Sequence, residues 1–136
     1  MGLFSKKVNY PELSKEHPAA KQIESIKGPL EQLVGQVSDP LEVVPADNHG
    51  YVLIGKPPKK FGIALLEEGS FKNFVALAKE KGLGDPKILS VIESLGDAYK
   101  KNQDSDRYKI TVAGRDVVVT PCRELEAQIE QIVQSV

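Results

Sequence analysis

Residues 41–66, with the sequence LEVVPADNHGYVLIGKPPKKFGIALL, decide the fold of this chain. They contain three short apolar runs of the kind that forms strands, at 41–44, 51–54 and 61–66. Asp, Asn and Gly separate the first two runs, and these residues favour a tight turn because they form local backbone hydrogen bonds or tolerate positive φ angles. The third run is apolar except for Gly62, which indicates burial on both faces. The stretch therefore predicts three consecutive strands.

The residues before this stretch have the spacing of an amphipathic helix at 18–36. Its apolar stripe consists of Ile23, Ile26, Leu30, Leu33 and Val34. These positions recur every three or four residues, so they fall on one helical face. Pro29 lies in the middle of the segment, and we expect a kink or break there because proline lacks a backbone donor and clashes with the preceding turn.

The residues after the stretch predict two helices, a hairpin and a final helix. The first helix starts at about Phe71 and ends at Gly82, and the second covers 85–99. Strands at 108–112 and 116–119 flank a tight turn. Thr120 is expected to cap the last helix, which puts Cys122 in its first turn. The resulting order, α-β-β-β-α-α-β-β-α, predicts an α+β fold, with a mixed or mainly antiparallel sheet of about five strands and helices packed on one face.

The composition is that of one globular domain. The chain has 136 residues and a formal net charge of −1, with 18 Lys and Arg against 19 Asp and Glu. We expect a flexible N-terminal tail at 1–17 and a single domain at 18–136, in which helix 18–36 can be an appendage to a core at 41–136. The near-neutral charge and the lack of Trp disfavour nucleic-acid binding.

The sequence carries no signal for membrane insertion or export. No apolar run is long enough to cross a bilayer, and the N-terminal residues lack the apolar stretch of a signal peptide. We therefore expect a cytoplasmic protein whose N-terminus does not bind a membrane surface. One cysteine excludes an intramolecular disulfide and a cysteine-based zinc site. No cofactor motif is present, so neither a cofactor nor a metal is expected.

Lys56, Lys59 and Lys60 cluster in the loop between two of the predicted strands. Three amines this close together can hold a phosphate, a carboxylate or an acidic surface of another protein. The loop lacks the glycine pattern of a P-loop, and Pro57 and Pro58 remove two backbone donors. The alternative is a solvated, stiff hairpin loop whose lysines discourage pairing with other strand edges.

Cys122 is the candidate reactive thiol. A position in the first turn of the last helix, next to Arg123, stabilises a thiolate. A catalytic thiol also requires a base, and the only histidines, His17 and His49, are distant in the sequence. A redox-sensitive thiol and a small buried residue are the alternatives.

His49 and Asp47 are side chains that can bind a metal or transfer protons. Either role requires further groups from elsewhere in the chain, for which Glu42, Glu67 and Glu68 are available. Turn formation already explains Asp47 and its neighbours, so we interpret these residues as a turn.

The apolar stripe of helix 18–36 is the strongest functional lead. If residues 41–136 close into a unit of their own, the stripe must be buried on the chain's own sheet or on another chain. The sequence therefore favours a small non-catalytic binding or regulatory module that contacts another protein or a second copy of itself. An alternative is a protein that binds a small anionic ligand through the three lysines. A third interpretation is a thiol-dependent or redox-responsive protein that uses Cys122.

Overall fold

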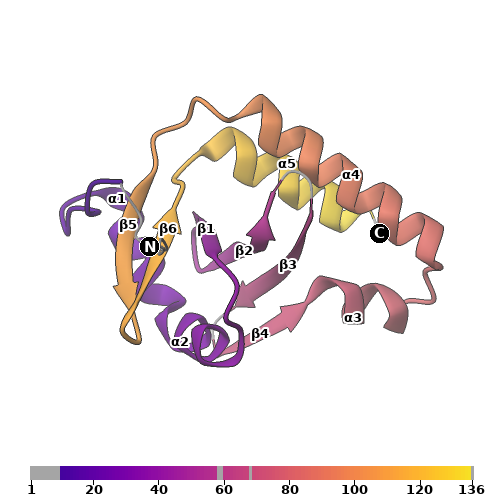
Figure 1. Cartoon of the computed structure of the whole chain (residues 1–136), viewed down its shortest axis with the longest axis horizontal. Helices are drawn as coiled ribbons and strands as arrows, with labels where there is room; N and C mark the ends of the chain where they lie inside the picture. Colours follow the sequence, from indigo (N-terminus) through magenta and orange to yellow (C-terminus); the bar gives the residue numbers. More distant parts are fainter. Residues whose placement is uncertain (1–9, 58–59, 68, 136) are drawn as a thin grey trace, which may run out of the picture.

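The computed structural model describes residues 10–57, 60–67 and 69–135, with Lys60 described through its backbone only (Figure 1). These residues form five helices and six strands. The first six elements are α1 (Pro18–Ser25), α2 (Lys27–Gln36), β1 (Leu41–Ala46), β2 (His49–Lys56), β3 (Lys60–Glu67) and β4 (Ser70–Asn73). The others are α3 (Phe74–Glu80), α4 (Asp85–Lys101), β5 (Tyr108–Val112), β6 (Arg115–Val119) and α5 (Arg123–Gln134).

All six strands belong to one sheet, in the order β4-β3-β2-β1-β6-β5. The strands β1 to β4 form an antiparallel meander, and β5 and β6 form a hairpin. The two parts join where β1 and β6 pair in parallel, with Val43 opposite Val119. The α+β class and the mixed sheet are confirmed, with one strand more than the sequence predicts.

The helices cover both faces of the sheet, so the expected packing on one face is wrong. Val43 and Val52 pack with α1 and α2, whereas Val44 and Leu53 pack with α3, α4 and α5. In Figure 1, α4 and α5 lie side by side, away from α1 and α2. Successive residues of a strand point to opposite faces, and the central strands are apolar at successive positions. Each face therefore requires its own cover of helices.

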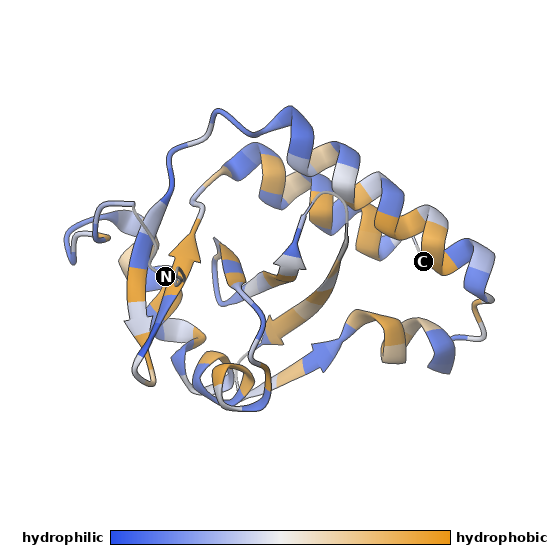
Figure 2. Cartoon of the chain, viewed as in Figure 1, coloured by the Kyte–Doolittle hydropathy of each residue, from blue (hydrophilic) through white to orange (hydrophobic). Residues whose placement is uncertain are grey.

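Figure 2 shows β3 and β6 as mainly hydrophobic and the loop between α4 and β5 as hydrophilic.

The predicted break in helix 18–36 is present, but it lies at Ile26 and not at Pro29. Ile26 has φ −118° and ψ 15°, and it separates α1 from α2. Pro29 is the third residue of α2. The first backbone N–H groups of a helix have no acceptor within the helix, so a proline at this position costs no hydrogen bond. The proline is therefore tolerated inside the second helix, and the chain turns three residues earlier.

The apolar stripe of α1 and α2 packs on the chain's own sheet. Its five side chains, Ile23, Ile26, Leu30, Leu33 and Val34, are at most 8% exposed and share one core with β1, β2, β3 and β6. Gly50 in β2 makes the approach of α1 and α2 possible, because a Cβ there would lie 2.8 Å from Ile26 Cδ1. Of the two ways to bury the stripe, the structure shows docking within the chain, so these side chains form no exposed contact for a partner.

Hydrogen bonds from Arg115 connect the end of α2 to the β5–β6 hairpin. Its guanidinium donates to the backbone carbonyl oxygens of Val34, Val37, Ser38 and Asp39. The last carbonyls of a helix lack partners within the helix, and an arginine close to them provides both hydrogen bonds and a favourable charge. This contact joins residues that are about 80 positions apart and holds α2 on the sheet.

The strand β4 is an element that the sequence analysis missed. Phe71 pairs opposite Leu66 in the sheet, although its spacing from Phe74 suggests a helix. The helix α3 begins later than expected because Asn73 caps it, with Oδ1 accepting from the backbone N–H groups of Val75 and Ala76. Gly82 follows α3 with φ +82°, which agrees with the predicted helix end.

Part of the segment that we expected to be a tail lies against β5. Leu13 N donates to the Lys109 carbonyl at 3.0 Å, and Lys109 N donates to the Pro11 carbonyl at 2.8 Å. The side chain of Leu13 also packs against the core that contains α1 and α2. These contacts attach residues 11–13 to the edge of the sheet. The rest of the expected tail, residues 1–9, lies outside the described residues.

Candidate functional site

A hollow of about 480 Å³ opens between the β1–β2 turn, the end of β3 and the C-terminal half of α5. A volume of this size is typical of small-ligand pockets. Its wall combines apolar and acidic side chains, among them Tyr51, Leu65, Val133, Glu67 and Glu130. No Lys or Arg belongs to this wall among the residues that the structure describes. The hollow is therefore suited to a ligand with a positive charge.

Three potential ligand groups converge beside this hollow. One ligand atom each from His49, Glu126 and Glu130 lies within 4.8 Å of the others. His49 is the first residue of β2, and Glu126 and Glu130 are one turn apart on α5. The β1–β2 turn and α5 are far apart in the sequence, and burial of Leu125 and Ile129 against the sheet brings them together. We call these three residues the His49 cluster.

Glu126 carries a buried oxygen, Oε2, without a hydrogen-bond partner among the described residues. Burial raises the pKa of the Glu126 carboxyl, the charge of Glu130 raises it further, and the charge of His49 lowers it. A buried oxygen without a donor is costly, and a second carboxylate one turn away adds repulsion. A bound cation would relieve both.

A backbone carbonyl orients the His49 ring. Its Nδ1 lies 2.8 Å from the carbonyl oxygen of Asp47. A carbonyl oxygen can only accept, so this contact places a proton on Nδ1, and whenever the ring is neutral its lone pair is on Nε2. The turn is itself held by α1, because Gln22 Nε2 donates to Asp47 Oδ1 at 2.9 Å.

Tyr51 lies on the wall of the hollow, beside His49. Its ring meets the His49 ring edge to face, with centroids 5.7 Å apart. Burial raises the pKa of Tyr51 above its ordinary value, and nearby carboxylates, led by Glu130, raise it further. The carboxylates therefore act on the same space from both sides of the hollow.

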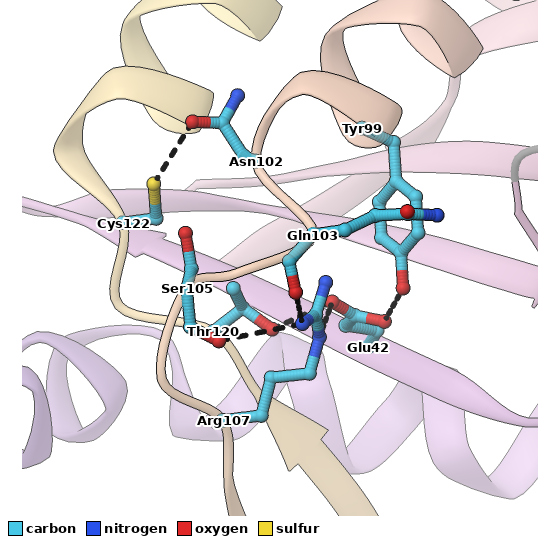
Figure 3. A network of polar contacts seen from close by, with 8 residues as sticks. All are labelled: Glu42, Tyr99, Asn102, Gln103, Ser105, Arg107, Thr120 and Cys122. Atoms are coloured by element: carbon cyan, nitrogen blue, oxygen red, sulfur yellow. Dashed lines mark hydrogen bonds and ion pairs between the residues drawn. The ribbon is translucent and has the colours of Figure 1, made fainter.

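A second polar cluster surrounds Glu42 (Figure 3). Tyr99 Oη donates to Glu42 Oε1 at 2.8 Å, and Thr120 Oγ1 donates to Oε2 at 2.6 Å. Arg107 Nε donates to Oε2 at 3.2 Å, and its guanidinium lies over the Tyr99 ring. Burial, and then the charge of Glu42, raise the pKa of Tyr99 to about 12. Both carboxylate oxygens have donors, so Glu42 is not a free base, and the cluster joins β1 to α4, to the loop between α4 and β5, and to the residue that follows β6.

Cys122 is the N-cap residue of α5, so the expected cap at Thr120 is wrong and the helix begins two residues later than the sequence predicts. The Thr120 hydroxyl donates to Glu42 instead. Cys122 Sγ accepts from Leu125 N at 3.4 Å and donates to Asn102 Oδ1 at 3.5 Å (Figure 3). Cys122 and His17 line a common hollow of about 880 Å³, but no hydrogen bond joins them within the described residues. His17 instead caps α1, with Nδ1 accepting from Ala19 N. Each of the two side chains has a structural role at a helix start.

The three lysines of the candidate anion site lie mostly outside the described residues. Lys56 is exposed at the end of β2, and the Cα of Lys56 is paired with that of Lys60 across the β2–β3 hairpin. Lys59 and the side chain of Lys60 belong to the part that is not described. The structure therefore supports the hairpin but does not test the anion site.

The sequence identified His49 but not its neighbours. Of the acidic residues considered with it, Glu42 lies in the other cluster, Glu67 lines the hollow, and Glu68 is outside the described residues. Glu126 and Glu130 were missed because they are 77 and 81 positions away in the sequence. The available signal was a pair of glutamates at i and i+4 next to the apolar face of α5.

Comparison of this chain with protein-family models, with curated proteins and with solved structures found no match.

Proposed function

We propose that this protein is a non-catalytic binding module that holds a small cationic ligand between the β1–β2 turn and α5. One observation supports this most directly. The His49 cluster brings two carboxylates and an imidazole together, and one oxygen of Glu126 is buried with no hydrogen-bond donor among the described residues. Convergent polar groups beside a partly apolar hollow are the usual mark of a ligand site.

The charge of the region favours a cation over an anion. Glu67 and Glu130 lie on the wall of the hollow, and Glu126 adjoins it. The imidazole cannot neutralise the negative charge of three carboxylates. A ligand with one or two positive charges can neutralise part of it. This ligand class is the opposite of the anion that the sequence suggests for the lysine loop.

Other reactive residue types of the described chain are used to hold the structure together. Glu42 is fully hydrogen-bonded, Cys122 caps α5, and His17 caps α1. A general base or nucleophile needs a free lone pair directed at a substrate. These contacts disfavour a catalytic role for Glu42, Cys122 and His17.

The other expectations from the sequence remain predictions. They are contact with another protein or a second copy, anion binding at Lys56, Lys59 and Lys60, a thiol-dependent or redox-responsive role of Cys122, and a cytoplasmic location. No helix in the described part of the chain has both the length and the apolar character needed to span a bilayer.

The proposal is tested by thermal unfolding of the untagged full chain with a panel of cations. The panel contains putrescine, spermidine and divalent metal ions. A ligand present at about 100 times its Kd should add about 2.7 kcal/mol of stability and so raise Tm. Glu130→Gln should abolish this rise. Glu124→Gln removes the same charge from an exposed position of α5 and should retain it.

Two results would contradict the proposal. One is a panel in which no cation raises Tm. The other is an equal rise in wild type, Glu130→Gln and Glu124→Gln, because that would report general screening of negative charge.

A further inference from the structure

We propose that the His49 cluster binds one divalent transition-metal ion through His49 Nε2 and a carboxylate oxygen each of Glu126 and Glu130. This inference rests on the proposed function and specifies the class of cation. Nothing in the comparisons or in the sequence motifs assigns a metal to this chain.

The spacing of the three groups suits a single ion. Ligand atoms bound about 2.0–2.2 Å from a tetrahedral zinc ion are about 3.3–3.6 Å apart. The ligand atoms of the His49 cluster already lie within 4.8 Å of one another. Each glutamate side chain has several rotatable bonds, so a change of rotamer can bring its carboxylate closer to the ion.

The hydrogen bond of His49 prepares its ring for a metal. Histidine ligands in metal sites usually donate their second ring nitrogen to a carbonyl or carboxylate, which sets both tautomer and orientation. His49 Nδ1 makes such a contact with the Asp47 carbonyl, and Gln22 holds Asp47 from α1. The free Nε2 is the atom that can bind the ion. This contact is made by the backbone of the β1–β2 turn. It is therefore independent of the clustering of Glu126 and Glu130.

The environment of Glu126 supplies a second reason for an ion. Its buried Oε2 has no donor among the described residues, and Glu130 repels it from the next turn of α5. Of the charges that shift the pKa of Glu126, those of Glu130 and Asp47 raise it and that of His49 lowers it. A metal ion would provide the missing partner for this oxygen and would neutralise the repulsion.

The ligand types favour a transition metal over calcium or magnesium. Imidazole is a good ligand for Zn²⁺ and similar ions, whereas Ca²⁺ and Mg²⁺ prefer sites built only from oxygen. Three protein groups also leave at least one position of the ion for water.

Titration calorimetry of the untagged full chain with Zn²⁺ tests the inference, with Mg²⁺, Ca²⁺ and putrescine as comparisons. We expect one Zn²⁺ per chain and much weaker binding of Mg²⁺ and Ca²⁺. His49→Gln, Glu126→Gln and Glu130→Gln should each weaken Zn²⁺ binding by at least about tenfold. His17→Asn is the matched control, because asparagine can keep the cap of α1, and its Zn²⁺ affinity should equal that of wild type.

The Tm of Glu126→Gln without metal distinguishes a role of Glu126 as a metal ligand from a structural role. Glu126→Gln removes the repulsion with Glu130, so its Tm without metal should equal or exceed that of wild type while the Zn²⁺-induced rise in Tm disappears. A metal-free Tm well below that of wild type would instead assign Glu126 a structural role and overturn the inference.

The remaining outcomes distinguish the two proposals. If putrescine or spermidine raises Tm in a Glu130-dependent way and Zn²⁺ does not bind, the metal site is wrong and the cation-binding module stands. If Zn²⁺ binds equally well to His49→Gln and wild type, the binding is adventitious and the inference fails. If no cation binds, both proposals fail.

Discussion

Arg107 Nε lies 3.2 Å from Glu42 Oε2, and the two side chains are 10% and 12% exposed although they come from residues 65 positions apart. The carboxylate also accepts from Tyr99 and Thr120. Removing one partner of a buried ion pair leaves the other charge without compensation. The Glu42 cluster therefore holds β1 to the loop that follows α4.

Glu42→Gln should lower the free energy of unfolding by roughly 3 kcal/mol, because Arg107 would keep its charge in a nearly buried place without a carboxylate. Urea denaturation measures the change. Glu31→Gln on the exposed side of α2 is the control, and its effect should stay within about 0.5 kcal/mol. An equally small effect of Glu42→Gln would show that the ion pair contributes little.

Tyr99 should make the protein less stable at high pH. The folded state raises the pKa of Tyr99 from 10.0 to about 12, chiefly through burial and the charge of Glu42. The neutral phenol is thus favoured by folding, so its contribution is complete below pH 10 and is lost as the pH rises toward 12. The stability difference between wild type and Tyr99→Phe should shrink across this window. A difference that stays constant would contradict the assigned pKa.

Leu30 should be essential for folding of the whole domain. Its side chain is fully buried between α2 and the sheet. Leu30→Ala should cost about 2–5 kcal/mol, because the substitution removes apolar contacts and leaves a cavity. Chemical denaturation followed by circular dichroism gives the value. Gln32→Ala on the exposed side of α2 is the matched control and should change stability by less than about 0.5 kcal/mol.

Cys122 should be replaceable by serine and not by alanine. Its Sγ accepts from Leu125 N at the start of α5, which is the role of an N-cap side chain. Cys122→Ser preserves an acceptor and should leave Tm unchanged or higher, whereas Cys122→Ala should lose about 1 kcal/mol. Equal Tm values for the two variants would show that the sulfur does not act as a cap.

Local sequence determined most of the elements. The apolar runs at 41–44, 51–54 and 61–66 are strands β1, β2 and β3, and Gly82 follows the end of α3 as expected. Such features depend on residues within one or two turns of each other, so periodicity and turn chemistry reveal them. Phe71 is an exception. Its spacing from Phe74 suits a helix, but Phe71 lies in a strand because it pairs with β3.

Tertiary structure decided how these elements meet. The parallel pairing of β1 with β6, the helices on both faces and the burial of the stripe of α1 and α2 follow from which apolar surfaces fit together across the whole chain. The His49 cluster has the same origin. Glu126 and Glu130 are unremarkable surface residues in the sequence, and they become ligand candidates only because packing of α5 places them beside His49. The local preferences of a sequence specify each helix and strand. Contacts between distant residues instead depend on how the whole chain buries its apolar surface.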